Sequence, residues 1–206
     1  MNDTDKISQI FDFLKISENL KKTRRWKNTP GMKRKETSAD HSWHLALLVI
    51  LATNELGIKI DTLKSIEMAL VHDLVEAITD DYEATLILLG QRTQKQKHDE
   101  ELAAIKKIKA TLPSESGNKF YNLWQEYEKT KTPEAKFVRA LDKIESINHM
   151  LVLKHKCFDH PEFVAPFPNE STRNFPESIP LLKELQKRLK PEYKKHGWEW
   201  KKEYDV

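Results

Sequence analysis

Scarcity of glycine limits the folds open to this 206-residue chain more than any other feature of its sequence. Its five glycines lie at least 26 positions apart; they are Gly31, Gly57, Gly90, Gly117 and Gly197. All-β sandwiches and barrels need frequent turns, for which glycine is a usual residue, so the sequence disfavours them. The same spacing excludes the glycine-rich phosphate-binding loops of dinucleotide-binding folds and P-loop proteins, because those motifs need glycines a few residues apart.

Apolar residues recur every three or four positions along most of the chain, which is typical of amphipathic helices. Helices are predicted over residues 7–20, 38–56, 61–74, 95–112, 120–127, 132–147 and 178–189. Ser38 or Asp40, Asp61 and Thr132 are the expected N-caps of the helices that begin there, and Gly57 is placed to end one of them. No stretch reads convincingly as a β-strand, so the predicted fold class is all-α. We expect one domain over residues 1–206, with its core in residues 5–155 and a loop, a C-terminal helix and a basic tail in 156–206.

Charge and hydropathy exclude several classes of protein. The chain has 35 basic and 32 acidic residues and a net charge of +3, which does not suggest a nucleic-acid binder. Its longest apolar run, Leu45–Ala52, falls far short of the roughly 20 residues that span a bilayer, so no membrane partner is expected. The N-terminal residues lack the pattern of a secretory signal, and the single cysteine, Cys157, cannot form an internal disulfide. We therefore expect an intracellular, cytoplasmic protein.

Histidines and carboxylates in apolar helical segments indicate a metal site. Asp73 follows His72 directly after the apolar run 68–71, and Asp142 lies inside the apolar segment 137–142, where an uncompensated carboxylate is costly to bury. Glu76 lies four residues after His72, so a helix that continues that far would put both on one face. With His41 from the preceding helix, these residues make a mixed nitrogen and oxygen site that suits Mn, Fe, Co, Ni or Zn better than Ca. A salt bridge from Asp73 to a lysine is the alternative interpretation.

The same positions belong to longer motifs. These are Arg25-Trp26, residues 36–42 with Asp40-His41, residues 69–77 with His72-Asp73, residues 123–128 and residues 134–142. Together they resemble the 5'-deoxynucleotidase branch of the HD-domain phosphohydrolases, an all-helical superfamily, including its HD-domain-containing protein 2 group. The resemblance extends from about residue 14 to residue 153. It implies a single HD-domain helical bundle with a metal site between its helices, and a homodimer.

The resemblance implies which residues hold the metal. His41, His72, Asp73 and Asp142 match the metal ligands of that branch. The implied cofactor is a divalent metal ion: Mn, Co or Mg, with Fe, Ni and Zn as further candidates.

The resemblance also implies residues for the substrate. Glu76 matches the catalytic acid, and Asp81 matches a second acid beside the substrate sugar. Arg25 matches an arginine that contacts phosphate, and Trp26 matches an aromatic residue that disfavours a 2'-hydroxyl. Relatives usually have glycine immediately before the second acid, whereas this chain has Asp80 there. Taken without the resemblance, Arg25 belongs to a run of solvated basic residues and Trp26 is an ordinary packing residue.

Other features have simpler interpretations. His44, three residues after His41, is expected to pack or to orient a neighbour rather than to bind metal. Residues 98–101 are expected to form a solvated acidic face; the alternative is that one of these carboxylates approaches a second metal. Residues 156–176, rich in proline and without periodicity, are expected to form a long ordered loop or a lid, and the Trp-containing tail to pack on the body.

The expected activity is metal-dependent hydrolysis of deoxyribonucleoside 5'-monophosphates. A phosphomonoester dianion needs charge neutralisation, which a metal and the planar fork of Arg25 supply. Hydrolysis of a cyclic nucleotide, an alarmone or a nucleoside triphosphate is the alternative within the enzyme class. An inactive HD scaffold that binds a nucleotide or a macromolecular partner is the alternative outside it.

Overall fold

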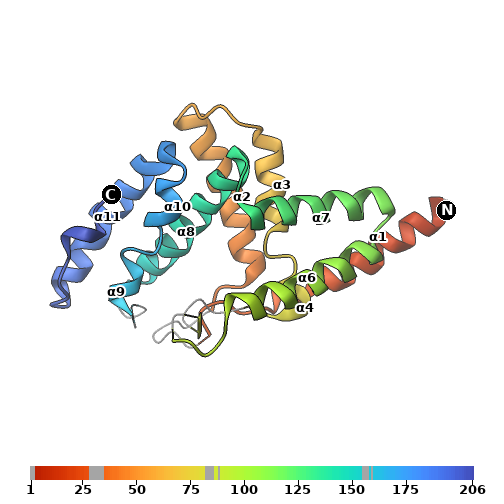
Figure 1. The fold of residues 1–206 in the computed structure, drawn as a ribbon, viewed down its shortest axis with the longest axis horizontal. Coiled ribbons are helices and arrows are strands. Elements are labelled where there is room, and N and C mark those ends of the chain that lie inside the picture. The colour runs from red at the N-terminus through yellow and green to blue at the C-terminus, as the bar shows by residue number, and fades with distance from the viewer. Residues whose placement is uncertain (1–2, 28–34, 82–85, 88, 155–157, 159) are drawn as a thin grey trace.

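The structure of the protein is a computed structural model that describes residues 3–27, 35–81, 86–87, 89–154, 158 and 160–206. Helices form its regular structure (Figure 1), and these residues contain no β-strand, only an isolated bridge between Arg24 and Thr37. The predicted all-α fold is confirmed. Among the helices in these ranges, none is long and apolar enough to cross a membrane.

The elements follow one another in a simple order. They are α1 (Asp3–Ser17), η1 (Glu18–Lys21), α2 (Ser38–Glu55), α3 (Thr62–Val71), α4 (Glu76–Thr79), α6 (Gln94–Thr111), α7 (Ser114–Lys129), α8 (Pro133–Leu153), α9 (Pro161–Val164), α10 (Asn169–Arg173), η3 (Pro176–Ser178), α11 (Ile179–Lys195) and η4 (Lys202–Tyr204). The sequence predicts a break over residues 80–82 and a short helix or a buried turn over 84–89, but residues 82–85 and 88 lie outside the described residues.

Side-chain caps fix where the central helices begin. Thr37 caps α2 by accepting the N–H of Asp40, whose carboxylate accepts the N–H of Thr37 in return. The prediction that Ser38 or Asp40 is the cap was therefore wrong, because Asp40 occupies the third helical position of a capping box. Asp61 and Thr132 are the caps of α3 and α8, as predicted.

The chain leaves α3 earlier than its apolar pattern predicts. The helix ends at Val71 instead of continuing to residue 74, and the next turns are held by bonds between residues three apart. The N–H of Leu74 donates to the carbonyl of Val71, and that of Glu76 donates to the carbonyl of Asp73, both at 3.0 Å. This tighter turn connects α3 to α4, so His72 and Glu76 do not belong to one continuous α-helix.

The central core lies where α2, α3, α7 and α8 pack against one another. Helix α8 contributes its most buried face, with Phe137, Val138, Leu141 and Ile147 all 0% exposed. Helix α6 packs against α1 and α7 on one side, while α10 and α11 pack against α8 on the other (Figure 1). Side chains that point from α2, α3 and α8 toward one another therefore meet in the middle of the molecule.

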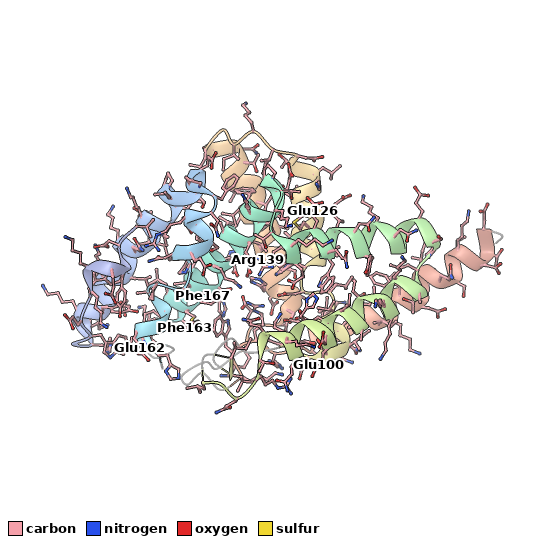
Figure 2. The ribbon with its side chains drawn as sticks, viewed as in Figure 1. Glu100, Glu126, Arg139, Glu162, Phe163 and Phe167 are labelled. Atoms are coloured by element: carbon pink, nitrogen blue, oxygen red, sulfur yellow. The ribbon has the colours of Figure 1, made fainter. Side chains whose placement is uncertain are left out.

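Short helices replace much of the predicted loop or lid after α8. Within residues 160–178 the chain forms α9, α10 and η3, each about one turn long, because prolines interrupt the helical pattern repeatedly. Figure 2 shows Arg139 of α8 beside Phe167 and Phe163 from this segment. Helix α11 extends beyond the predicted residue 189 to Lys195. The tail packs on it as expected, with Tyr204 only 4% exposed.

Candidate metal centre and active site

Four predicted metal ligands meet between α2, the end of α3 and α8. Nε2 of His41 lies 3.2 Å from Oδ1 of Asp142 and 3.8 Å from Oδ2 of Asp73. Nε2 of His72 lies 3.2 Å from Oδ2 of Asp73. His41, His72 and Asp73 bring ligand atoms within 4.8 Å of one another. Asp142 closes the group from α8.

Hydrogen bonds fix the orientation of both imidazole rings. Nδ1 of His72 donates to the carbonyl of Ala69 at 2.9 Å, and Nδ1 of His41 faces the carboxylate of Glu145. Each ring therefore presents Nε2 to the cluster. Both Nε2 atoms are buried and have no hydrogen-bond partner among the described residues. Two buried imidazole nitrogens without a hydrogen bond, each facing an aspartate oxygen, fit a divalent metal.

Electrostatics around His41 favour a positive charge at the centre. Burial and the charge of Arg25 lower the pKa of His41, but the carboxylates of Glu145 and Asp142 outweigh them and raise it to about 10. For Asp142 burial acts in the opposite direction and raises the pKa. The charges of Lys143, His41 and His72 outweigh burial and hold the pKa of Asp142 well below its usual range. Asp142 and Glu145 are therefore ionised, and their negative charges favour a cation between the helices that carry them.

Tyr127 of α7 holds Asp142 in place. Its hydroxyl donates to Oδ2 of Asp142 at 2.6 Å, and Nζ of Lys143 lies 2.9 Å from the same oxygen. The other oxygen is left to face His41. The sequence placed Tyr127 on a helix and in the motif over residues 123–128 but assigned it no role at the site. The available signal was its hydroxyl, which usually finds a partner when tyrosine is buried.

Glu145 was also missed, although it lies three residues after Asp142 on the same predicted helix. It is 1% exposed and contacts Nδ1 of His41 through one oxygen and Nδ1 of His44, at 2.7 Å, through the other. Glu36, His41 and Glu145 form a second group with suitable ligand atoms. Glu36 already has Nε of Arg25 at 3.3 Å, so a cation compensates it.

Arg25 is a buried member of the centre. Its side chain is 11% exposed, and it donates to Oδ2 of Asp73 at 2.8 Å and to Oγ of Ser146 at 3.2 Å. The backbone N–H of Arg25 donates to the carbonyl of Glu36 at 2.9 Å, which fixes the segment beside α2. The interpretation of Arg25 as a solvated surface charge does not hold in this structure.

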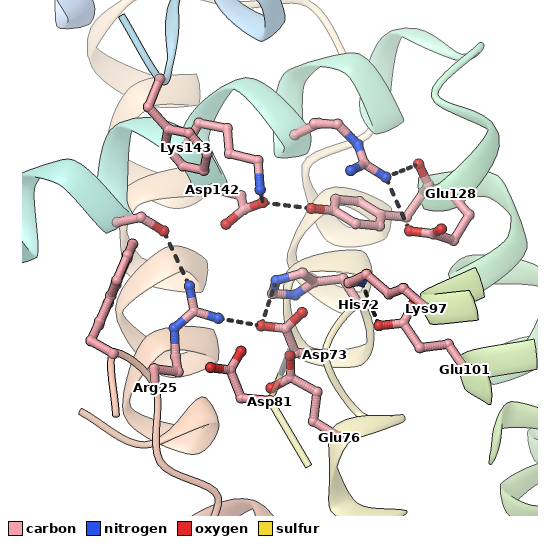
Figure 3. Close-up of a pocket in the computed structure, with 15 residues that line it drawn as sticks. Arg25, His72, Asp73, Glu76, Asp81, Lys97, Glu101, Glu128, Asp142 and Lys143 are labelled. Atoms are coloured by element: carbon pink, nitrogen blue, oxygen red, sulfur yellow. Dashed lines mark hydrogen bonds and ion pairs between the residues drawn. The ribbon is translucent and has the colours of Figure 1, made fainter. Parts of the chain in front are cut away.

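Glu76 lies in the same cavity as His72 despite the break in the helix (Figure 3). It is 5% exposed and accepts a hydrogen bond from Oγ of Ser38 at 2.5 Å. Burial, together with the charges of Asp73 and Asp81, raises its pKa well above the usual value. A raised pKa suits a carboxyl group that handles protons near neutral pH.

Of the two adjacent aspartates, Asp81 lines the cavity and Asp80 points away. The carboxylate of Asp80 forms an ion pair with Nζ of Lys27 at 2.6 Å and is 61% exposed. Asp80 has a φ of +66°, a conformation that glycine adopts readily and other residues adopt at a cost. A glycine, which the resemblance leads one to expect at this position, would adopt this conformation at lower cost than the aspartate.

Trp26 combines an unusual backbone with an unpartnered donor. Its φ is +55°, and its indole Nε1 is buried without a hydrogen-bond partner among the described residues. The guanidinium of Arg25 lies 6.0 Å from the ring centroid. A strained bulky residue at the edge of a polar cavity is typical of a functional site rather than of simple packing.

The cavity contains further charged residues (Figure 3). Residues 98–100 are exposed, as predicted, but Glu101 is 3% exposed and accepts a hydrogen bond from Lys97 at 2.5 Å. The prediction of a solvated face was therefore wrong for Glu101, which lines the cavity. Glu128 and Arg139 form another pair in the wall, at 3.1 Å.

A helical bundle with two histidines and two aspartates at its centre fits the class of HD-domain metal-dependent phosphohydrolases. The comparison with family models agrees with this class. Residues 17–182 match the HD domain family model, and the chain belongs to this family. Among curated relatives, it is 38% identical to 5'-deoxynucleotidase HDDC2 of Dictyostelium discoideum over 148 residues, which cover 68% of this chain and 75% of the relative. It is 28% identical to the human 5'-deoxynucleotidase HDDC2 over 182 residues, which cover 86% of this chain and 84% of the relative.

Solved structures show the same fold. A predicted metal-dependent phosphohydrolase from Magnetospirillum magnetotacticum superposes with a TM-score of 0.77 at 20% identity, over 94% of this chain and 98% of its own. The PH0347 protein from Pyrococcus horikoshii superposes with a TM-score of 0.67 at 24% identity, over 86% of this chain and 99% of its own. These likenesses establish the helical architecture around the cluster.

Proposed function

We propose that this protein is a metal-dependent phosphomonoesterase that hydrolyses deoxyribonucleoside 5'-monophosphates to deoxynucleosides and phosphate. One observation carries the proposal: His72, Asp73 and Asp142 line one polar cavity with Arg25 and Glu76, and the buried imidazole of His41 contacts both aspartates. Relatives that are 5'-deoxynucleotidases support the choice of substrate.

His41, His72, Asp73 and Asp142 would hold a divalent metal in this proposal. Such a metal supplies a Lewis acid that neutralises phosphate charge and makes hydroxide available near neutral pH. The chain prepares the ligands in advance. Ala69 and Glu145 orient the two imidazoles, and Tyr127 and Lys143 occupy the outer oxygen of Asp142.

Arg25 would bind the phosphate group. Its contacts with Asp73 and Ser146 use one N–H of each terminal nitrogen, so two further N–H groups of the planar fork are free to donate to phosphate oxygens. Because Asp73 bridges Arg25 and the imidazole of His72, the phosphate would lie against both the arginine and the metal ligands.

Glu76 would handle the proton of the reaction. Its carboxyl either orients the attacking water or passes a proton to the leaving 5'-oxygen, and the bond from Ser38 fixes its direction. Asp81 would contact the sugar from the same wall. These roles need no movement of the helices that carry the residues.

The experiment that tests the proposal is phosphate release from a panel of nucleotides by metal-stripped protein reconstituted with Mn, Co or Mg. We expect release from deoxyribonucleoside 5'-monophosphates to exceed release from ribonucleotides, and no release without metal. Cyclic nucleotides, alarmones and triphosphates belong in the same panel, since preferential hydrolysis of one of these would replace the proposed substrate. No turnover on any of them would favour an inactive scaffold.

Trp26→Ala should lower the preference for deoxyribose over ribose. An indole fixed beside the phosphate-binding Arg25 would exclude a 2'-hydroxyl by a clash rather than by an added attraction. The measurement is kcat/KM for dAMP and AMP in the wild type and the variant. Arg25→Ala is the control and should damage both substrates alike. An unchanged ratio in Trp26→Ala would remove the sugar-selecting role.

Glu145→Gln should weaken metal binding without unfolding the protein. His41 and His44 contact different oxygens of Glu145, and glutamine replaces one of these oxygens with an NH2 donor, so it cannot accept from both rings in this arrangement. Loss of a group that orients a metal ligand typically costs about 10- to 100-fold in metal affinity. Competition with a chelator measures this, with His44→Ala as the control that keeps the bond to His41. An affinity equal to wild type would contradict the role.

A further inference from the structure

The cavity that contains the metal cluster is small for a nucleotide. Its volume is about 100 Å³, and its wall is mostly polar and charged. Sites for small organic ligands are usually about 300–1,000 Å³. The cavity is therefore large enough for a phosphate group and part of a sugar, and the remainder of a nucleotide has to lie outside it.

A second cavity of about 450 Å³ adjoins the first, between α8 and the segment that contains α9 and α10. Arg139, Lys143 and Phe167 border both cavities. Figure 2 shows Arg139, Phe167 and Phe163 next to one another along this side of the molecule. A molecule bound at the metal cluster can extend past these three shared residues without crossing the core.

The lining of the second cavity fits a flat heteroaromatic ring. Phe163 and Phe167 form an apolar wall with ring centroids 4.8 Å apart, and Pro166 continues it. Ser171 and Asn174 provide hydrogen-bonding groups on the same lining. An apolar wall with a few polar groups is the usual composition of a site for an organic ring.

A second phosphate group fits this cavity less well. Arg139 is paired with Glu128 at 3.1 Å, and Lys143 lies 2.9 Å from Asp142, so their charges are already compensated. The remaining charged residues of the lining, Lys136 and Glu170, have opposite signs. The cavity thus has little net positive charge left with which to bind an anion.

We propose that the cavity between α8 and the α9–α10 segment binds the nucleobase of the substrate, with Phe167 as the residue that contacts it. This inference rests on the proposed function, and it names the part of the protein that binds the base of the substrate. The contacts are apolar and lack a dense set of directed donors and acceptors, so all four bases should be accepted. The larger purines gain more from the contact than the pyrimidines.

The test compares a substrate that has a base with one that lacks it. We expect Phe167→Ala to lower kcat/KM for dAMP by roughly 5- to 100-fold, the range for loss of a base–aromatic contact. We expect a loss of less than about threefold on 2-deoxyribose 5-phosphate, which has no base to contact the ring. Phe167→Tyr keeps the ring and should restore dAMP turnover. Circular dichroism and the melting temperature establish that each variant is folded.

Inhibition constants provide the same comparison without turnover of the smaller substrate. Phe167→Ala should weaken inhibition by 2'-deoxyadenosine, which has a base and no phosphate, and leave inhibition by inorganic phosphate near the wild-type value. Equal losses for both inhibitors, or no loss for either, would overturn the base site. Failure of the proposed function looks different, because the wild-type protein would then release no phosphate from dAMP.

Discussion

Replacing His72 by alanine, or Asp142 by asparagine, is expected to remove the metal from the protein and to abolish phosphate release. Both residues are 3% exposed and face the centre, His72 from the end of α3 and Asp142 from α8, so each substitution removes a ligand that no neighbour replaces. The asparagine keeps the shape of Asp142 beside Tyr127 and removes its charge. Metal content per chain, measured by elemental analysis, gives the result independently of activity.

The controls separate loss of the metal from loss of the fold. His160→Ala removes a histidine that pairs with Glu162 away from the centre and should leave the metal content unchanged. Circular dichroism should show a helical protein for all three variants, because the core of α8 is intact. Metal retained in both His72→Ala and Asp142→Asn would exclude the proposed set of ligands.

Glu76→Gln is expected to keep the metal and the fold while losing about 10²- to 10⁴-fold in turnover, the usual cost of removing a general acid or base. The amide oxygen of glutamine can still accept the bond from Ser38, so the side chain keeps its place. What it loses is the ability to carry a proton. The measurement is kcat on the best deoxyribonucleotide, together with metal content.

Asp80→Asn provides a matched control for Glu76→Gln. It neutralises a carboxylate four residues further along the chain, which pairs with Lys27 outside the cavity. Its turnover should stay close to that of the wild type. A Glu76→Gln protein with bound metal and activity within about threefold of wild type would remove Glu76 from the proton-handling step.

Much of the helical framework followed from local sequence. The spacing of apolar residues located the helices, and Asp61 and Thr132 were recognised as caps because their side chains satisfy backbone groups only a few residues away. The prediction of the α2 cap was wrong because more than one neighbouring residue has a side chain that can cap a helix. Both Thr37 and Ser38 can cap a helix, and the capping box with Asp40 decided between them.

The candidate site was only partly visible in the sequence. A carboxylate in an apolar stretch identified Asp73 and Asp142, and the same rule applies to Glu145, which was overlooked. Tyr127 was assigned no role and Glu101 was predicted to be solvated, because periodicity reports which side of a helix is apolar and not which neighbour faces it. The choice between Asp80 and Asp81 also depended on the backbone, since a φ of +66° at Asp80 turns the two side chains in different directions.

The sequence by itself determined the all-helical fold, and it indicated a candidate donor set of two imidazoles and two carboxylates, since both depend on residue type and short-range spacing. Tertiary structure decided how these residues work together. Arg25 reaches Asp73 across 48 positions, and His41 reaches Glu145 across 104, through packing of α2, α3 and α8 that no local pattern encodes. Burial in that packing sets the charge state of the groups, because the cost of desolvation is offset only by neighbours brought from distant parts of the chain.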